Sequence, residues 1–262
     1  MNSSSSPVRP LLCVLVALLF AGLITSPNVL HATPKPGRLL VVTVTKSYRH
    51  QSIPLAEQII KELGEESRSY TVDYARTDEE LAVKMSTSGL QNYDGVLFAS
   101  TSGDIPLPDR EAFLNWIKAG NSFVGVHAAS DTLHNYPPYV EMVGGEFETH
   151  GPQLKVTLRV EDAKHPATKH FDRSFEMLDE IYIFKNFHRK KVHMLLALDR
   201  NPNKNDPLAF NRPGYYPIAW FRNYGKGRVF YTALGHREDV WRSEPFKRHV
   251  LGGIQWALKQ AK

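Results

Sequence analysis

The sequence predicts an α/β fold, a three-layer α/β/α, doubly wound and mostly parallel sheet with an antiparallel extension. Three observations lead to this class. Short apolar runs alternate with segments of helical periodicity in the first half of the chain, which is the order of βαβ units. Those runs are apolar on both faces, as parallel strands covered by helices are. In the second half, strand patterns follow one another without intervening helices, which predicts antiparallel pairing.

Four strand patterns and three helix patterns fill the first half. The first helix is expected to begin after Ser52, which can cap it, because apolar residues recur at helical spacing from Ile53 to Leu63. Pro108 is expected to open the third helix, since proline suits a first turn, and Gly120 is expected to end it. The expected strands are 38–45, 70–75, 93–100 and 122–128, and the expected helices start at 53, 78 and 108.

The second half contributes the extension and a closing helix. Residues 153–160 alternate apolar and polar side chains, as a strand with one exposed face does. No repeat and no linker rich in proline, glycine or serine interrupts the pattern, so residues 33–262 are expected to form one domain. The other expected strands are 181–187, 194–198, 218–221 and 228–232, the closing helix is 245–258, and residues 204–216 are expected to form a long loop.

Residues 1–32 have the layout of a secretory signal peptide. Arg9 precedes an apolar run at residues 11–24, and a short polar segment leads to Ala32, after which cleavage is expected. The run is short for a membrane span. This pattern predicts a periplasmic or secreted protein. The alternative is an uncleaved segment that anchors the chain and is its only contact with a membrane.

Composition excludes several kinds of chemistry. Cys13 is the single cysteine and lies inside the apolar run, so a chain that starts near Thr33 has no disulfide, no thiolate nucleophile and no cysteine-ligated metal. The formal net charge is +5, and the longest basic cluster is only 189–191. Nucleic-acid binding is therefore not expected. The oligomeric state, including a homo-oligomer, is left open.

Histidine and acidic side chains follow several predicted parallel strands where each strand ends. Tyr48 and His50 follow the first strand, His127 and Asp131 follow the fourth, and His236 follows the last. Carboxyl ends of parallel strands lie at one edge of the sheet, where α/β proteins bind ligands, so these side chains are expected to share a site. His127 is the most informative, because it stands at a strand-to-turn-to-helix junction of the kind in which many hydrolases hold their nucleophile.

Two later segments are expected to reach the same edge. Residues 144–152 begin with paired glycines, which permit unusual backbone conformations, and carry Glu146 and His150. The alternative is that this segment only makes a tight connection between a helix and the strand that follows. Glu180 is expected to act as a general base or as an acceptor that sets a histidine tautomer, because alternation along its strand puts it on the face of Tyr182.

Several stretches of this sequence match the motifs of a known protein family. They are 48–50, 125–132, 144–147, 150, 179–182, 217–220 and 224–236. On these, the sequence resembles the trehalose-utilisation (ThuA-like) family, whose fold is that of class I glutamine amidotransferases. The resemblance implies that His127 lies where an amidotransferase has its nucleophilic cysteine. It also implies that His236 lies near the catalytic histidine, with Glu238 or Asp239 close to the orienting acid. Glutaminase activity is excluded without a cysteine, and the family's link to trehalose implies a sugar ligand.

The first hypothesis is an exported enzyme that acts on a sugar or an oxidised sugar derivative, as an isomerase, lyase or hydrolase. Histidines would move protons in it, because imidazole titrates near neutral pH, and carboxylates would assist them. The expected catalytic residues are His127, His236, Glu180 and Asp131, and the expected substrate-binding residues are His50, Tyr48, His150, Tyr182 and Trp220.

Two other functions remain open. One is a metal-dependent hydrolase, in which neutral imidazoles hold zinc or another divalent ion. Its ligands would have to converge from separate loops, because no pair of the candidate histidines has the spacing of a helical metal motif. The other is a sugar-binding module without catalysis, which needs only a polar cleft and aromatic side chains. The histidines available as metal ligands are His50, His127, His150 and His236.

Overall fold

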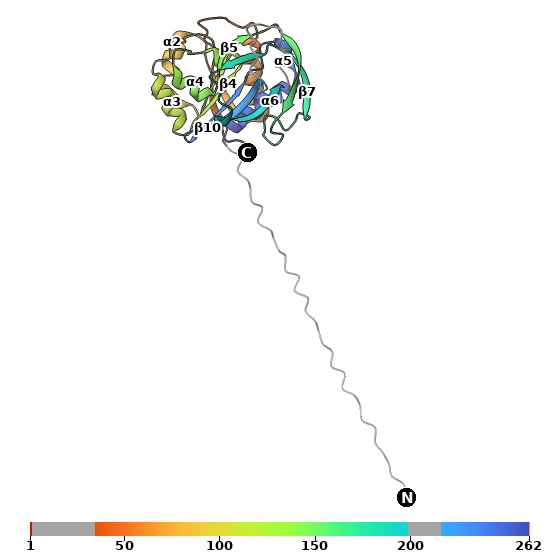
Figure 1. Cartoon of the computed structure of the whole chain (residues 1–262). Helices are drawn as coiled ribbons and strands as arrows, with labels where there is room; N and C mark the ends of the chain where they lie inside the picture. Colours follow the sequence, from red (N-terminus) through yellow and green to blue (C-terminus); the bar gives the residue numbers. More distant parts are fainter. Residues whose placement is uncertain (2–34, 199–215, 262) are drawn as a thin grey trace. The chain divides into compact units, whose positions relative to one another are not determined.

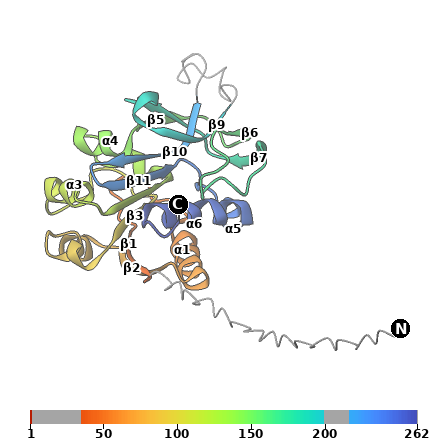
Figure 2. The same ribbon diagram turned by 90° about the horizontal axis from the view of Figure 1, so that it is seen from below.

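The computed structural model describes residues 1, 35–198 and 216–261. The compact unit Pro34–Lys262 is built on a mixed nine-stranded sheet with helices on both faces (Figures 1 and 2). The strand order is β2-β1-β3-β4-β11-β10-β9-β6-β7. One half of this sheet is parallel and the other half antiparallel, so the predicted three-layer α/β class with an antiparallel extension is confirmed.

The parallel half brings the candidate site together. β1 (Gly37–Val42) pairs with β2 (Tyr70–Ala75) and with β3 (Gly95–Ala99). β4 (Ser122–Val126) lies between β3 and β11 (Gly227–Thr232), and all of these pairings are parallel. The carboxyl ends of β1, β3, β4 and β11 therefore open at the same edge of the sheet.

The antiparallel half extends the sheet beyond β11 by four strands. They are β10 (Tyr216–Tyr224), β9 (His193–Leu198), β6 (Leu154–Val160) and β7 (Ser174–Asp179), while β5 (Glu146–His150) and β8 (Tyr182–Lys185) form a separate two-stranded sheet. The sequence patterns did not predict β5 and β7. β7 is short and half-exposed, and only Phe175 and Met177 on one of its faces pack against the core.

In the described part of the chain, six helices cover the sheet in two layers (Figure 2). Each layer closes its own apolar core, because the parallel strands alternate their side chains between the two faces. One layer contains α1 (Ile53–Ser67), α5 (Glu238–Arg242) and α6 (Glu244–Ala257); the other contains α2 (Asp78–Lys84), α3 (Arg110–Lys118) and α4 (Pro137–Val143). Short 3₁₀ helices are η1 (Gly89–Asn92), η2 (His127–Asp131) and η3 (Arg189–Lys191).

Some local expectations need correction or lie outside the described residues. Ser52 does not cap α1 with its side chain; its hydroxyl instead donates to the carbonyl of Gly235 over 3.3 Å. The predicted signal peptide and nearly all of the predicted loop 204–216 fall outside the described residues. None of the helices in the described ranges combines the length and apolar composition that a membrane span requires.

A substitution at Gly252 tests how closely α6 packs against the rest of the unit. A Cβ atom at this position would lie 2.2 Å from the carbonyl oxygen of Pro166, which is backbone and cannot rotate away. Alanine normally stabilises a helix interior by about 1 kcal/mol relative to glycine. We expect Gly252→Ala to lower the free energy of unfolding instead, by about 1–3 kcal/mol in a urea titration. Arg248→Ala, at an exposed position of the same helix, is the control. A more stable Gly252→Ala variant would contradict this packing.

Candidate active site

The turn that follows β4 holds His127 in a constrained position. His127 has a φ of +51°, a left-handed conformation that costs a non-glycine residue roughly 1–2 kcal/mol. The hydroxyl of Tyr231 donates to its backbone carbonyl over 2.8 Å, and its Nδ1 lies 2.7 Å from the carbonyl oxygen of Ala233. These bonds join the turn to β11 and to the residue after it. Its side chain is fully buried.

Four side chains from separate segments converge at this turn. We call them the histidine–glutamate centre. Among the described residues, one ligand-type atom from each of the four lies within 4.8 Å of the others. Three follow parallel strands and one lies between β7 and β8, so the sheet topology brings them together. The members of the centre are His50, His127, Glu180 and His236.

Hydrogen bonds set the orientation of the central imidazole. Because the carbonyl of Ala233 can only accept, Nδ1 of His127 carries a proton, and its Nε2 faces the other members of the centre. The hydroxyl of Tyr182 is hydrogen-bonded to this Nε2 over 3.0 Å. Nδ1 of His236 lies 3.2 Å from the same Nε2 and 3.2 Å from Oε2 of Glu180.

The charges of the centre are strongly coupled. Burial opposes ionisation of Glu180, but hydrogen bonds and attraction from His127 and His236 outweigh it and hold the pKa of Glu180 well below its usual value. The hydrogen bond to Glu180 raises the pKa of His236. Burial, followed by repulsion from His127 and His236, lowers the pKa of His50 to about 3. These pKa shifts favour an ionised carboxylate at Glu180 and a neutral imidazole at His50 near neutral pH.

Asp179 positions two members of the centre, although the sequence pattern favoured its neighbour Glu180 as the functional acid. Its Oδ2 accepts from the amide of Gly235 over 2.7 Å, and its Oδ1 accepts from the amide of Glu180 over 2.9 Å. These bonds tie the end of β7 to the residue before His236. Burial raises the pKa of Asp179. Only the adjacent acidic pair in the sequence pointed to this position.

Three of the residues expected to bind substrate surround the centre. Nδ1 of His150 donates to the carbonyl of Gly151 and lies 3.2 Å from Oε1 of Glu180. Tyr182 is buried and contributes its hydroxyl rather than the open ring face that was expected. The ring of Tyr48 is 59% exposed and packs edge-on against the ring of His50, with centroids 4.8 Å apart.

The structure corrects other expected roles. Trp220 is fully buried and donates from Nε1 to the carbonyl of Val143, so its ring has no face for a sugar. Asp131 is bonded to His134 and is not among the converging ligand atoms of the centre. The acid paired with His236 is Glu180. Glu238 and Asp239, expected near this histidine, pair with Arg242 and Arg237.

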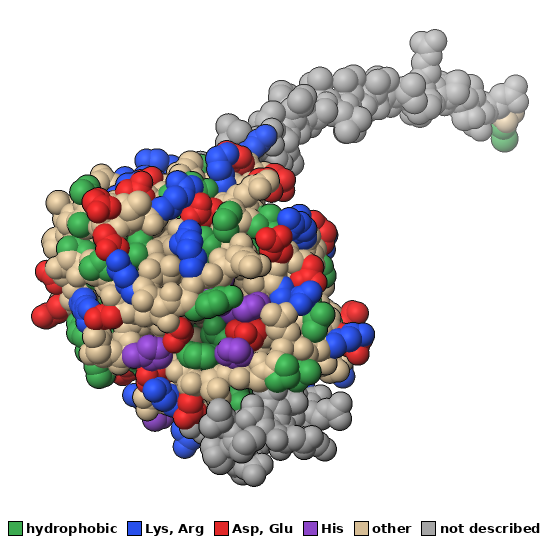
Figure 3. Space-filling model, turned by 90° about the horizontal axis from the view of Figure 1, so that it is seen from above, with side chains coloured by type: hydrophobic (Ala, Val, Ile, Leu, Met, Phe, Trp, Pro, Cys, Tyr) green, Lys and Arg blue, Asp and Glu red, His purple; other side chains and the backbone are tan. Residues whose placement is uncertain are grey.

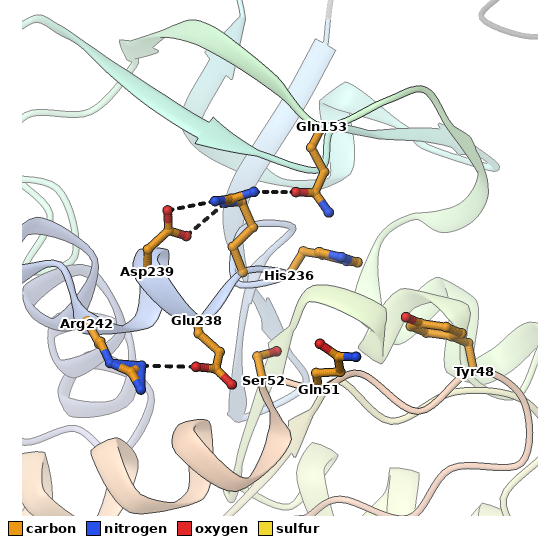
Figure 4. Close-up of a pocket in the computed structure, with 9 residues that line it drawn as sticks. Tyr48, Gln51, Ser52, Gln153, His236, Glu238, Asp239 and Arg242 are labelled. Atoms are coloured by element: carbon orange, nitrogen blue, oxygen red, sulfur yellow. Dashed lines mark hydrogen bonds and ion pairs between the residues drawn. The ribbon is translucent and has the colours of Figure 1, made fainter.

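A polar pocket opens beside the centre at His236. Its volume is about 510 Å³. Figure 4 shows Tyr48, Gln51 and Gln153 around it, on segments far apart in the sequence. Figure 3 shows histidine and acidic side chains gathered close together on one face of the folded unit. The residues that line this polar pocket are Tyr48, Gln51, Ser52, Gln153, His236, Arg237, Glu238, Asp239 and Arg242.

The family model ThuA, described as trehalose utilisation, matches residues 38–257. The chain belongs to the ThuA family. A search of the curated proteins found no match.

Solved structures show the same fold. A ThuA-like protein from Bacteroides uniformis has a TM-score of 0.70 at 23% identity, over 88% of this chain and 95% of that one. One from Parabacteroides merdae has a TM-score of 0.69 at 19% identity, over 86% and 91%. A β-galactosidase from Rahnella sp. R3 has a TM-score of 0.55 at 12% identity, over 86% of this chain and 32% of that chain. At these identities the similarity shows the fold alone.

In this ThuA-family chain, a second polar network holds the segment after His127. His134 lies between two carboxylates, with Nε2 2.7 Å from Asp131 and Nδ1 2.7 Å from Glu146. Both acceptors are satisfied only by the doubly protonated ring, and these bonds, that to Asp131 first, raise the pKa of His134. Lys185 and Asn186 also donate to Glu146, which joins η2 to β5 and β8.

This network predicts a pH-dependent contribution to stability. Because the pKa of His134 is raised on folding, its contribution is complete below the unfolded value near 6.5 and is lost as pH rises through the folded value. We expect His134→Gln to reduce the free energy of unfolding more at about pH 5.5 than at about pH 8.5, in urea titrations at both values. Asn92→Ala, at an exposed residue outside this network that does not titrate, is the control. An equal loss at both pH values would show that His134 acts only by packing.

Proposed function

We propose that this ThuA-family chain is an exported enzyme that acts on a carbohydrate at the histidine–glutamate centre. One observation carries the proposal: a group of three histidines and a glutamate, of which all but His236 are buried, opens through His236 onto a polar pocket. Export rests on the sequence of residues 1–32. Clustered acid and base groups beside a pocket are the usual mark of a catalytic site.

The polar pocket has the chemistry that a sugar requires. The exposed ring of Tyr48 offers a flat apolar face to the C–H side of a sugar ring. The amides of Gln51 and Gln153 and the carboxylate of Glu238 offer donors and acceptors to hydroxyl groups. The description of the family as trehalose utilisation supports the same class of ligand.

The centre supports proton-transfer chemistry on such a substrate. His236 lines the pocket and contacts Glu180, so this pair is placed to give or take a proton. Glycosidic cleavage, isomerisation and proton abstraction beside a carbonyl all need such a group. His127 is buried, so it does not contact the substrate and acts on it only through the groups that it binds. Glutaminase activity is not proposed, because an imidazole replaces the thiol at the turn after β4.

We expect His236→Ala to lower turnover by roughly 100-fold or more, the usual contribution of an acid–base group. The assay is a panel of disaccharides and their keto derivatives, followed by chromatography of the products. His188→Ala, at an exposed histidine that does not line the pocket, should keep the wild-type rate. Thermal melting of each variant separates lost chemistry from lost folding.

Two results would contradict the proposal. The first is saturable sugar binding by the wild-type protein with no turnover of any member of the panel, which would make the chain a binding module. The second is a folded His236→Ala variant that turns over a substrate at the wild-type rate.

A further inference from the structure

We infer that the histidine–glutamate centre binds one divalent metal ion of the zinc class, through His50, His127, Glu180 and His236. This inference rests on the proposed function in one respect only, that the substrate reaches the centre from the polar pocket. The evidence for the ion is geometric: ligand-type atoms of the four side chains converge, and His50 has a buried ring nitrogen without a hydrogen-bond partner among the described residues.

Three of the ligand atoms have the spacing of a metal site. Nε2 of His127, Nδ1 of His236 and Oε2 of Glu180 form a nearly equilateral triangle with sides of 3.2, 3.2 and 3.4 Å. Ligands at roughly 2.0–2.1 Å from a tetrahedral zinc ion are about 3.3 Å apart. An ion close to the centre of this triangle would therefore lie within bonding distance of all three atoms.

Nε2 of His127 has more polar neighbours than it can bond. A ring nitrogen makes one hydrogen bond, yet the hydroxyl of Tyr182, the ring nitrogen of His236 and an oxygen of Glu180 all lie within 3.4 Å of it. An ionised carboxylate oxygen can only accept, so its contact with this ring nitrogen needs a proton or a cation between them. A cation accepts electron density from all three ligand atoms at once.

The fourth residue supplies an independent observation. His50 is buried, and among the described residues its Nδ1 has no hydrogen-bond partner. A buried polar atom without a partner normally marks an absent water or ion, or a site of function. A ring nitrogen of His50 lies within 4.8 Å of the other ligand atoms, so this residue completes the set.

The residues around the centre have the arrangement that surrounds bound metals. A ligating histidine usually donates its other ring N–H to a carbonyl, as His127 does to Ala233 over 2.7 Å. Oε1 of Glu180 lies 3.2 Å from Nδ1 of His150, which leaves Oε2 for the ion. Burial of His127 and His50 also fits ligands better than groups that exchange protons with a substrate.

The ligand set selects the class of ion. Imidazole nitrogens favour zinc and neighbouring transition metals, whereas magnesium and calcium prefer oxygen ligands. Two histidines and a glutamate are a known ligand set of catalytic zinc. A substrate oxygen that enters from the polar pocket beside His236 would become a further ligand, and the ion would polarise it. With the ion bound, His236 and Glu180 would act on the substrate by holding the ion rather than by direct proton transfer.

The test uses tag-free protein, freed of metal by a chelator and titrated with Zn²⁺ or Co²⁺ by calorimetry. We expect about one ion per chain and a higher melting temperature with Zn²⁺. Tetrahedral Co²⁺ should give a visible absorption band. Glu180→Gln and His236→Ala should each weaken Zn²⁺ binding by more than about 100-fold, beyond the 10–100-fold effect of residues that only support ligands. Glu176→Gln and His188→Ala, at exposed positions, are the matched controls.

Metal binding and turnover are measured separately, because each tests a different claim. The absence of saturable binding near one ion per chain, or unchanged binding in folded Glu180→Gln and His236→Ala variants, would overturn the inference. Full turnover by metal-free protein would also overturn it while leaving the proposed enzyme intact. Tight binding lost in both variants would support the metal site even if no sugar in the panel were turned over, an outcome that counts against the proposed function alone.

Discussion

The hydrogen bond between His127 and the carbonyl of Ala233 holds the candidate active site in its arrangement. It joins the turn after β4 to the residue after β11, two strands that are parallel neighbours in the sheet. It also fixes the ring so that Nε2 faces the other members of the centre. Without it the left-handed backbone at His127 would have less to oppose its strain, and the ring would lose its defined tautomer.

A buried polar centre is costly to assemble, and the surrounding structure shows how this chain does so. Asp179 binds the backbone amides of Gly235 and Glu180, and the indole of Trp241 donates to the carbonyl of Gly235. These contacts fix Gly235, the residue before His236, through both its amide and its carbonyl. The network around His134 holds the other side, where η2 leaves the turn. The centre is thus supported by three separate segments, which keep four polar side chains close together, three of them buried.

Much of the fold could be predicted from patterns within short windows. Runs such as 122–126 are apolar on both faces and end in polar residues, so both the parallel sheet and the edge that carries His127 and His236 follow from local sequence. β7 could not be predicted in this way, because its half-exposed strand is defined by pairing with β6. The strand-end rule also identified His50, because it needs only the sheet topology.

The roles of several site residues could not be predicted, because they too depend on contacts between distant segments. Trp220 is apolar and aromatic in any sequence pattern, and only the tertiary structure shows that the protein core encloses it. Asp131 follows a strand as His127 does, yet its carboxylate meets His134, because the 3₁₀ turn directs the two side chains to different neighbours. The part played by Asp179 depends on an amide more than fifty residues away, and the three ligand-atom distances depend on contacts between distant segments.

A crystal structure of the protein equilibrated with Zn²⁺, with anomalous data at the zinc edge, tests the metal-binding centre most directly. We predict one strong anomalous peak about 2.0–2.2 Å from Nε2 of His127, Nδ1 of His236 and Oε2 of Glu180, with the bond from His127 to Ala233 retained. A structure in which these three atoms surround no metal, although zinc was in excess, would contradict it.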